Sequence, residues 1–316
     1  MTSEETKRFQ GSFSMVRWFD AQGGHLDAKG LSPSGKVIDV PLHRHNVTLN
    51  TFRIDLGLKY QLSPQWVMEA NVPYSTKTQE ATIDEIEPVS PAEMEAILRN
   101  QDIHHRNETY VGLADMDFLI GYGRPGLFIE NDYLSGRIGT TVPIGKTEED
   151  PWKLADAGLE HLHIQFGTGT FNPVADLHYS LPLYKRLNVH ASLRGKFPFY
   201  ENSKTYRGSR ELTYTAGLNY HLNDWISFQT SYFGFYQSFA YWAGEQDINT
   251  GLRFSMASVG TSVITPYNFP LSLTLMFPLY QETLYDDSDA FLDGTYEESD
   301  AFKFGPLVSL TVLYAF

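Results

Sequence analysis

The sequence contains no cysteine among its 316 residues, which excludes disulfides, zinc sites built on thiolates and catalysis by a thiol. It also lacks any run of the ~18–20 consecutive apolar residues that a membrane-spanning helix needs. If the chain crosses a bilayer, it must therefore do so with strands of about 9–11 residues.

Positive charge is also in short supply. Lys and Arg together number 24 against 38 Asp and Glu, which gives a formal net charge of −14 at pH 7. A balance this negative argues against nucleic acid as a partner. Residues 1–8 contain no apolar signal region, so we expect either a mature, exported form with an added initiating Met or a cytosolic protein. We favour the exported form, because a protein that crosses the outer membrane with strands must be exported before it inserts; this choice depends on the strands described below.

Aromatic residues, by contrast, are abundant: the chain has 19 Tyr and 21 Phe. The last stretch, 306–316, alternates as an extended strand does. Its apolar face would hold Val308, Leu310, Val312, Tyr314 and Phe316. This ending resembles the terminal signal of bacterial outer-membrane barrels. The alternative is a soluble protein with a C-terminal edge strand.

The stretch from about 47 to 62 shows the same alternation with charge on one side. One face is apolar and the other carries charged or small residues. The two sets are Phe52, Ile54, Leu56, Leu58 and Tyr60, and Thr51, Arg53, Asp55, Gly57 and Lys59. Such a strand meets lipid or a core with one face and water or a charged network with the other.

Apolar alternation recurs along the chain, and the segments are joined alternately by tight turns and by longer polar stretches. This pattern predicts an all-β fold, a transmembrane antiparallel β-barrel of about 12 strands with short periplasmic turns and long extracellular loops. We expect a single outer-membrane β-barrel domain over residues 1–316. The predicted extracellular loops cover about 20–46, 75–108, 145–168, 201–208, 239–249 and 282–301.

Two local signals refine this scheme. Ser90 and Glu93 have the spacing of a capping box, with Pro91 at the first helical position, and predict a short helix at about 91–99. We expect it on the barrel mouth or folded into it. Aromatic residues gather near the predicted strand ends, Trp18 and Trp66 among them, and predict two girdles at the level of the lipid headgroups.

The inward faces of the predicted strands collect charged residues of both signs. Because charges do not sit unpaired in a dry interior, the lumen either contains water or is laced by ion pairs. The predicted pore-lining residues are Arg53, Asp55, Lys59, Glu69, Asp115, Asp117, Arg137, Asp176, His178, His190, Arg194 and Lys196.

Three short motifs follow one another along the chain. They are Gly112-Leu113-Ala114-Asp115, Thr141-Val142-Pro143-Ile144-Gly145-Lys146 and Gly167-Thr168-Gly169-Thr170-Phe171-Asn172-Pro173. In this order they resemble the outer-membrane transporters associated with meta-pathway phenol degradation. The resemblance implies passage of small, often hydrophobic or aromatic molecules across the outer membrane, and it supplies no individual binding residue.

Seven of the ten histidines lie in the first three predicted loops. His43 with His45, and His161 with His163, place two imidazoles on one face of an extended segment, a spacing that a transition metal could use. No carboxylate or Cys stands at a fixed offset from them, so we interpret them as solvated loop histidines and keep these four as metal candidates. The acidic stretch 286–300 could hold Ca²⁺ or cations that bridge lipopolysaccharide, although a solvated loop is the default.

We therefore predict a channel or transporter for small solutes in the bacterial outer membrane, without a cofactor, in contact with outer-membrane lipids and lipopolysaccharide. Two alternatives remain: a barrel enzyme acting on lipid, and a closed structural or assembly barrel. The sequence shows no nucleophile-elbow pattern. Asp115, Asp117 and His178 could approach one another, but an ion network in the lumen explains them more simply, so we expect no enzymatic activity.

Overall fold

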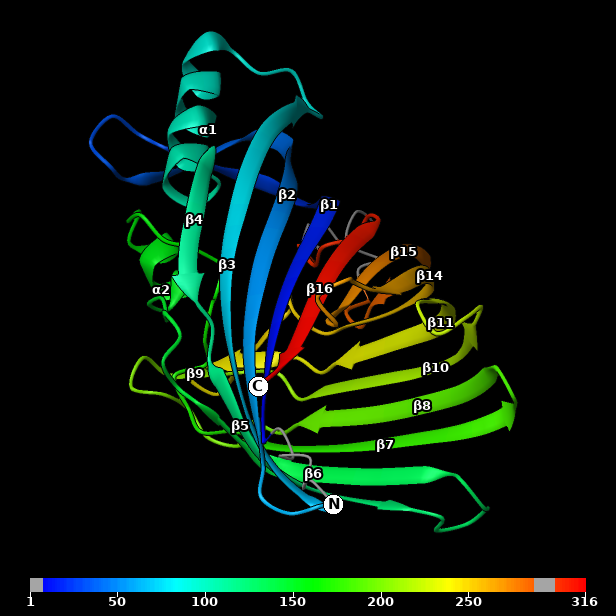
Figure 1. Ribbon diagram of the computed structural model, residues 1–316. Coiled ribbons are helices and arrows are strands. Elements are labelled where there is room, and N and C mark those ends of the chain that lie inside the picture. Colours follow the sequence, from blue (N-terminus) through cyan, green and yellow to red (C-terminus); the bar gives the residue numbers. More distant parts are fainter. Residues whose placement is uncertain (1–7, 287–298) are drawn as a thin grey trace.

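The computed structural model describes residues 8–286 and 299–316, and these form a closed antiparallel barrel of 12 strands (Figure 1). The barrel closes where β1 pairs with β16, from Gln10 opposite Ala315 to Trp18 opposite Leu307. In the order in which they pair, the strands are β1 (Phe9–Leu31), β2 (Val37–Gln61), β3 (Trp66–Glu85), β5 (Met116–Pro125), β6 (Tyr133–Val142), β7 (Pro173–Tyr184), β8 (Leu187–Lys196), β10 (Glu211–His221), β11 (Ile226–Gln237), β14 (Leu252–Ile264), β15 (Pro270–Thr283) and β16 (Leu307–Ala315). The predicted fold class is confirmed.

The outer face of the barrel is apolar. Ile138 is 66% exposed and Leu56 is 54% exposed, and similar side chains stand on the same face of every strand around them. Exposed apolar side chains in such number are stable only against lipid. None of the helices among residues 8–286 and 299–316 is long and apolar enough to cross a membrane.

Aromatic side chains mark the end of the barrel that carries the tight turns. There the rings of Trp66 and Tyr122 lie 5.1 Å apart, and Phe9 stacks on Phe316 at 5.7 Å. Trp18, however, is not part of a girdle: its side chain lines the lumen, and its ring lies 5.8 Å from that of Phe304. The prediction for Trp18 is wrong because the residue shares the inward face of β1 with Val16.

The first three strands are much longer than the others and rise beyond them at the far end (Figure 1). Much of the predicted loop 20–46 is the continuation of β1 and β2 around a short turn at 32–36, and β3 continues to Glu85 inside the predicted loop 75–108. The Gly, Pro and His content of these segments suggested loops. Their strands persist because parts of the mouth distant in sequence cover them: Ala21 and Leu49 pack with Ile164 and Phe166, and Val40 packs with Ile97.

The helix α1 (Pro91–His104) packs on this extension. Its capping box is present: Ser90 N donates to Glu93 Oε2 at 2.8 Å. Ala96 and Ile97 are buried against Val40, and the helix continues five residues past the predicted end at 99. The helix thus lies on the mouth, at the β1–β2 hairpin.

The third long loop folds into the mouth. It contains the short helix α2 (Pro151–Asp156), whose N-cap Asp150 accepts from Trp152 N at 3.1 Å. Further on, Ile164 and Phe166 pack against a buried cluster made of Ala21, Leu49 and Tyr110. The strand β4 (Glu108–Leu113) pairs with the upper part of β3, and the small sheet of β9 (Tyr206–Arg207), β12 (Ala240–Trp242) and β13 (Glu245–Asp247) lies in the fourth and fifth loops. Most of the acidic stretch 286–300 lies outside the described residues.

Candidate functional site: the lumen and its mouth

One half of the lumen wall carries a continuous chain of ion pairs across β2, β3, β5, β6, β7 and β8. Arg137 lies at its centre, with Nη1 2.5 Å from Glu69 Oε2 and Nε 2.6 Å from Asp176 Oδ1. Arg194 continues it, donating to Asp176 Oδ2 at 3.3 Å and to Asp117 Oδ2 at 2.8 Å. We call Lys59, Glu69, Arg137, Asp176, Arg194 and Asp117 the ion-pair chain.

The ion-pair chain explains how the lumen accommodates so many charges. It has three cations and three anions, and Lys59 closes one end at 3.4 Å from Glu69. Each charged group therefore has an opposite charge within reach, as partly buried charges require. Lys196 forms a further pair with Glu211 at 2.5 Å.

A separate pair stands apart from the chain on β2. Arg53 Nε donates to both carboxylate oxygens of Asp55, at 3.0 and 2.9 Å, and Asn71 Nδ2 donates to Asp55 Oδ1 at 3.2 Å. Arg53 lines three cavities of the lumen, with volumes of about 380, 540 and 540 Å³. The pair thus stands where these spaces meet.

The other part of the wall, from β11 through β16 to β1, is uncharged where it lines the 380 Å³ cavity. Apolar side chains and hydroxyls alternate there, and the apolar group is Val16, Trp18, Phe233, Met256, Met276 and Leu307. The same cavity is bordered by Arg53, Asp55 and His190. One side of this inner cavity therefore suits an apolar ring or chain, and the other side suits a polar or charged group.

Asp115 joins the three motifs of the sequence. It lies in the two-residue break between β4 and β5, where Oδ1 accepts from Gly145 N at 3.1 Å. Its Oδ2 accepts from both the backbone N and the hydroxyl of Thr168, each at 2.7 Å. Gly145 and Gly167 meet beside this carboxylate, where a Cβ on residue 167 would lie 2.5 Å from Asp115 Oδ1. The motifs thus hold the third loop against the barrel wall.

The twelve predicted pore-lining residues fall into three groups. Arg53, Asp55 and His190 border the inner cavity. A second cavity, of 540 Å³, is bordered by Arg53 again and by Glu69, Asp115, Asp117, Arg194 and Lys196. Lys59, Arg137 and Asp176 join these through the ion-pair chain, and His178 follows Asp176 two residues later on the same face of β7.

Seven histidines meet at the mouth. We call His25, His43, His45, His104, His105, His161 and His163 the histidine cluster; the ring centroids of its neighbouring members lie 4.2 to 6.5 Å apart. His43 and His45 are completely buried, and their Nε2 atoms lie 3.0 Å apart. The interpretation of solvated loop histidines is therefore wrong. It failed because segments distant in sequence bury one another at the mouth, which local spacing does not reveal.

Burial keeps five imidazoles of the histidine cluster uncharged near neutral pH. It lowers the pKa of His104 and the pKa of His163 to about 3, and the neighbouring imidazoles add to both shifts. Burial also lowers the pKa of His45, His105 and His161 below its ordinary value. Neutral imidazoles present a nitrogen lone pair, which is the form that binds metals.

The closed barrel, its apolar outer band and its charged lumen define a bacterial outer-membrane β-barrel. Comparison with solved structures agrees: an outer-membrane channel from Pseudomonas putida F1 has a TM-score of 0.57 at 12% identity, with both chains covered in full. The chain therefore has the fold of an outer-membrane channel, as the motif resemblance implies.

Two further solved structures are similar at a lower level. The monoaromatic hydrocarbon channel TodX, as a deletion mutant, gives a TM-score of 0.46 at 9% identity, covering 99% of this chain and 92% of that one. The NanC porin gives a TM-score of 0.45 at 8% identity, covering 94% of this chain and 100% of that one. No protein-family model and no curated protein matches the sequence.

Proposed function

We propose that the protein is an outer-membrane channel for small amphipathic organic molecules, aromatic acids and phenols among them, and that Arg53 and Asp55 select between them. The observation that carries this proposal is the inner cavity. Apolar side chains line one part of its wall and a charged pair lines another part, so a ring and its polar substituent find matching surroundings.

The size of the lumen supports small solutes. The inner cavity of about 380 Å³ lies at the lower end of the usual range for small-molecule sites. Trp18 and Arg53 also border the 540 Å³ cavity at the mouth, so a solute entering there meets the same two side chains on its way inward. The P. putida protein of the same fold is itself described as an outer-membrane channel.

We further propose that the barrel transports rather than catalyses. Asp117 is held by Arg194, and Asp115 is held by the backbone of the third loop. Both carboxylates are thus engaged by other groups of the protein, which supports a structural and electrostatic role. Outer-membrane lipids and lipopolysaccharide are the surroundings we propose for the apolar band and the long loops, and a small organic solute is the partner in the lumen.

Uptake into liposomes tests the proposal. The purified barrel is reconstituted, and entry of benzoate, phenol and gluconate is compared for the wild type, Arg53→Gln and Asp55→Asn. Removing the cation leaves Asp55 to repel anions, and removing the anion leaves Arg53 to attract them. We expect benzoate entry to fall about tenfold in R53Q and to rise in D55N, with phenol entry nearly unchanged.

Matched controls are available at the turn end of the barrel, where Arg124 and Asp224 are exposed. Arg124→Gln and Asp224→Asn change the same charges away from the lumen and should leave all three solutes unaffected. Equal benzoate entry in R53Q, D55N and both controls would contradict selection by the pair, and absence of any solute entry in well-folded wild type would contradict transport itself.

A further inference from the structure

The histidine cluster is built from four separate segments. His25 comes from the extension of β1, His43 and His45 from β2, His104 and His105 from the end of α1, and His161 and His163 from the third loop. Imidazole nitrogens need hydrogen-bond partners when they are buried. Inside the cluster, Nδ1 of His45 and Nε2 of His105 are buried without a hydrogen bond in the described structure.

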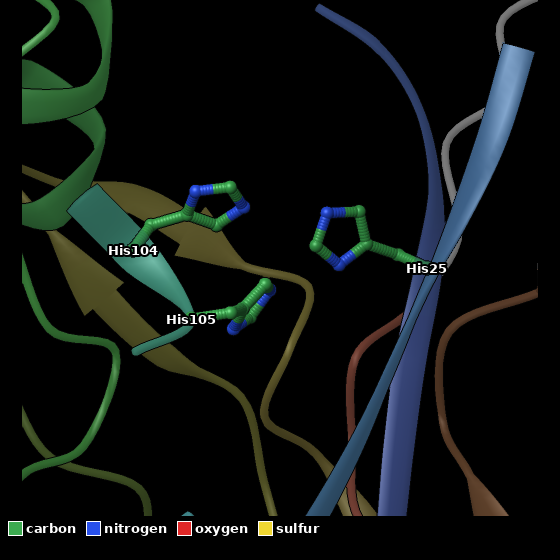
Figure 2. A group of neighbouring side chains, drawn as sticks. All are labelled: His25, His104 and His105. Carbon is green, nitrogen blue, oxygen red and sulfur yellow. The ribbon is translucent and has the colours of Figure 1, made fainter. Parts of the chain in front are cut away.

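Three of these imidazoles face one common space. Figure 2 shows the rings of His104 and His105 turned toward the ring of His25, which faces them from the neighbouring strand β1. One nitrogen from each can be chosen so that all three lie within 4.8 Å of one another. A second set, Asp27, His45 and His104, meets the same criterion and shares His104 with the first.

The contacts around these rings place one nitrogen of each against a carbonyl or a carboxylate oxygen. His104 Nδ1 donates to the carbonyl of Asn100 at 2.6 Å, which leaves the lone pair on Nε2. His25 Nδ1 lies 3.4 Å from Asp300 Oδ2, and His105 Nε2 lies 3.7 Å from the same oxygen. In metal-binding histidines, the ring nitrogen that does not bind the metal usually hydrogen-bonds to a backbone carbonyl or a carboxylate.

The donor types select a class of metal. Neutral imidazoles with a carboxylate beside them suit Zn²⁺, Co²⁺, Ni²⁺ and Cu²⁺, whereas Ca²⁺ and Mg²⁺ prefer oxygen ligands. In a tetrahedral zinc site with Zn–N bonds of about 2.0–2.1 Å, neighbouring ligand atoms lie about 3.4 Å apart. Small side-chain rotations therefore close the present arrangement around an ion.

We propose that the mouth of the barrel binds one divalent transition-metal ion, with His25, His104 and His105 as its imidazole ligands and Asp300 beside them. The ion links the end of α1 to the β1–β2 hairpin. Since His105 and Asp300 also line the 540 Å³ cavity at the mouth, the site stands at the entrance to the lumen. This inference does not depend on which solute the channel carries.

Titration of the refolded, untagged full chain tests the site, after treatment with a chelator. Zn²⁺ binding is measured by calorimetry and Co²⁺ binding by visible absorption, with Mg²⁺ as the comparison ion. We expect one Co²⁺ per chain with the spectrum of a nitrogen-rich site, and no response to Mg²⁺. His104→Gln and His25→Gln should each weaken Zn²⁺ binding by about 100-fold.

His221→Gln is the matched control, because His221 is exposed at the opposite end of the barrel. It should bind Zn²⁺ as the wild type does, and heat-modifiable migration in electrophoresis reports whether each variant has folded. If H104Q does not fold, H25Q decides the question, because the His25 side chain is the partly exposed member at 22%. Absence of Zn²⁺ binding in the folded wild type, or unchanged Zn²⁺ binding in H25Q and H105Q, would overturn the proposal. Loss of Zn²⁺ binding in H45Q but not in H25Q or H105Q would also overturn it, because the ion would then be bound by the second set, Asp27, His45 and His104.

Discussion

The carboxylate of Asp115 receives two hydrogen bonds from one residue, Thr168: one from its backbone N and one from its hydroxyl, both at 2.7 Å. Asp115 interrupts a barrel strand, and Thr168 ends the loop that folds into the mouth. This contact therefore fixes the loop that borders two of the cavities in the lumen. It also explains why the sequence has glycine on both sides, at 145 and 167, where the two backbones nearly touch.

We predict that Gly167→Ala displaces the third loop. The new methyl group would lie 2.5 Å from Asp115 Oδ1 and 2.7 Å from Gly145 Cα, so the backbone must move. Limited proteolysis of whole cells or proteoliposomes should cut the loop at least several-fold faster than in the wild type. Gly136→Ala is the control, since a Cβ there meets its nearest atoms at 3.8 Å and should change nothing. Equal cleavage of the two variants would show that the close contact does not hold the loop.

A second prediction is that the third loop, through Phe166, narrows the pore. Phe166 packs in the buried cluster of the mouth, and Lys77 Nζ lies 4.7 Å above its ring. Phe166→Ala should weaken the packing of the loop by about 3 kcal/mol and raise single-channel conductance. Phe171→Ala removes a ring that is 52% exposed and should leave conductance as it is. Unaltered conductance in F166A would show that the third loop does not narrow the pore.

Asp176 offers a test of the ion-pair chain. Its side chain is only 6% exposed and lies between Arg137 and Arg194. Asp176→Asn should cost about 3 kcal/mol in the free energy of unfolding, at the lower end for a buried pair because both arginines keep access to water. The uncompensated positive charge should also shift the reversal potential toward anion selectivity. Urea unfolding and a salt-gradient measurement give the two values, and D224N should alter neither. A D176N variant with wild-type stability and selectivity would show that the ion-pair chain contributes to neither property.

The fourth prediction is a pH dependence in the fifth loop. Burial raises the pKa of Asp247 to about 6, from an ordinary value of 3.8. The folded state therefore binds more protons than the unfolded state between pH 3.8 and about 6, so stability falls as pH rises through this window. Asp247→Asn should stabilise the loop at pH 7.5 by about 1–3 kcal/mol and have no effect at pH 3.5. Hydrogen exchange of residues 239–251 at the two pH values measures the difference, and a stabilisation independent of pH would rule out titration as its cause.

The sequence predicted the barrel well because its evidence is local. The alternation of Arg53 and Asp55 with Phe52 and Ile54 reports directly which face is lipid and which is lumen, and each strand repeats the signal. The capping box at Ser90 likewise located the start of α1 at Pro91, while the helix ends five residues after the predicted end. Strand periodicity and helix caps depend only on residues that are close in the sequence.

The site at the mouth could not be predicted in the same way. His25, His104 and His163 are neighbours only because the β1–β2 extension, α1 and the third loop fold onto one another. No carboxylate stands at a fixed spacing from these histidines in the sequence, yet Asp300, which is distant in sequence, lies beside His25 and His105. Nonlocal packing decides both burial and ligand sets.

Single-channel conductance in planar bilayers, with benzoate added as a blocker, tests the central claim most directly. An amphipathic lumen predicts a stable open channel whose current benzoate reduces reversibly, and whose block weakens in R53Q but not in R124Q. A well-folded barrel that carries no current, or a current indifferent to benzoate and to Arg53, would contradict the account.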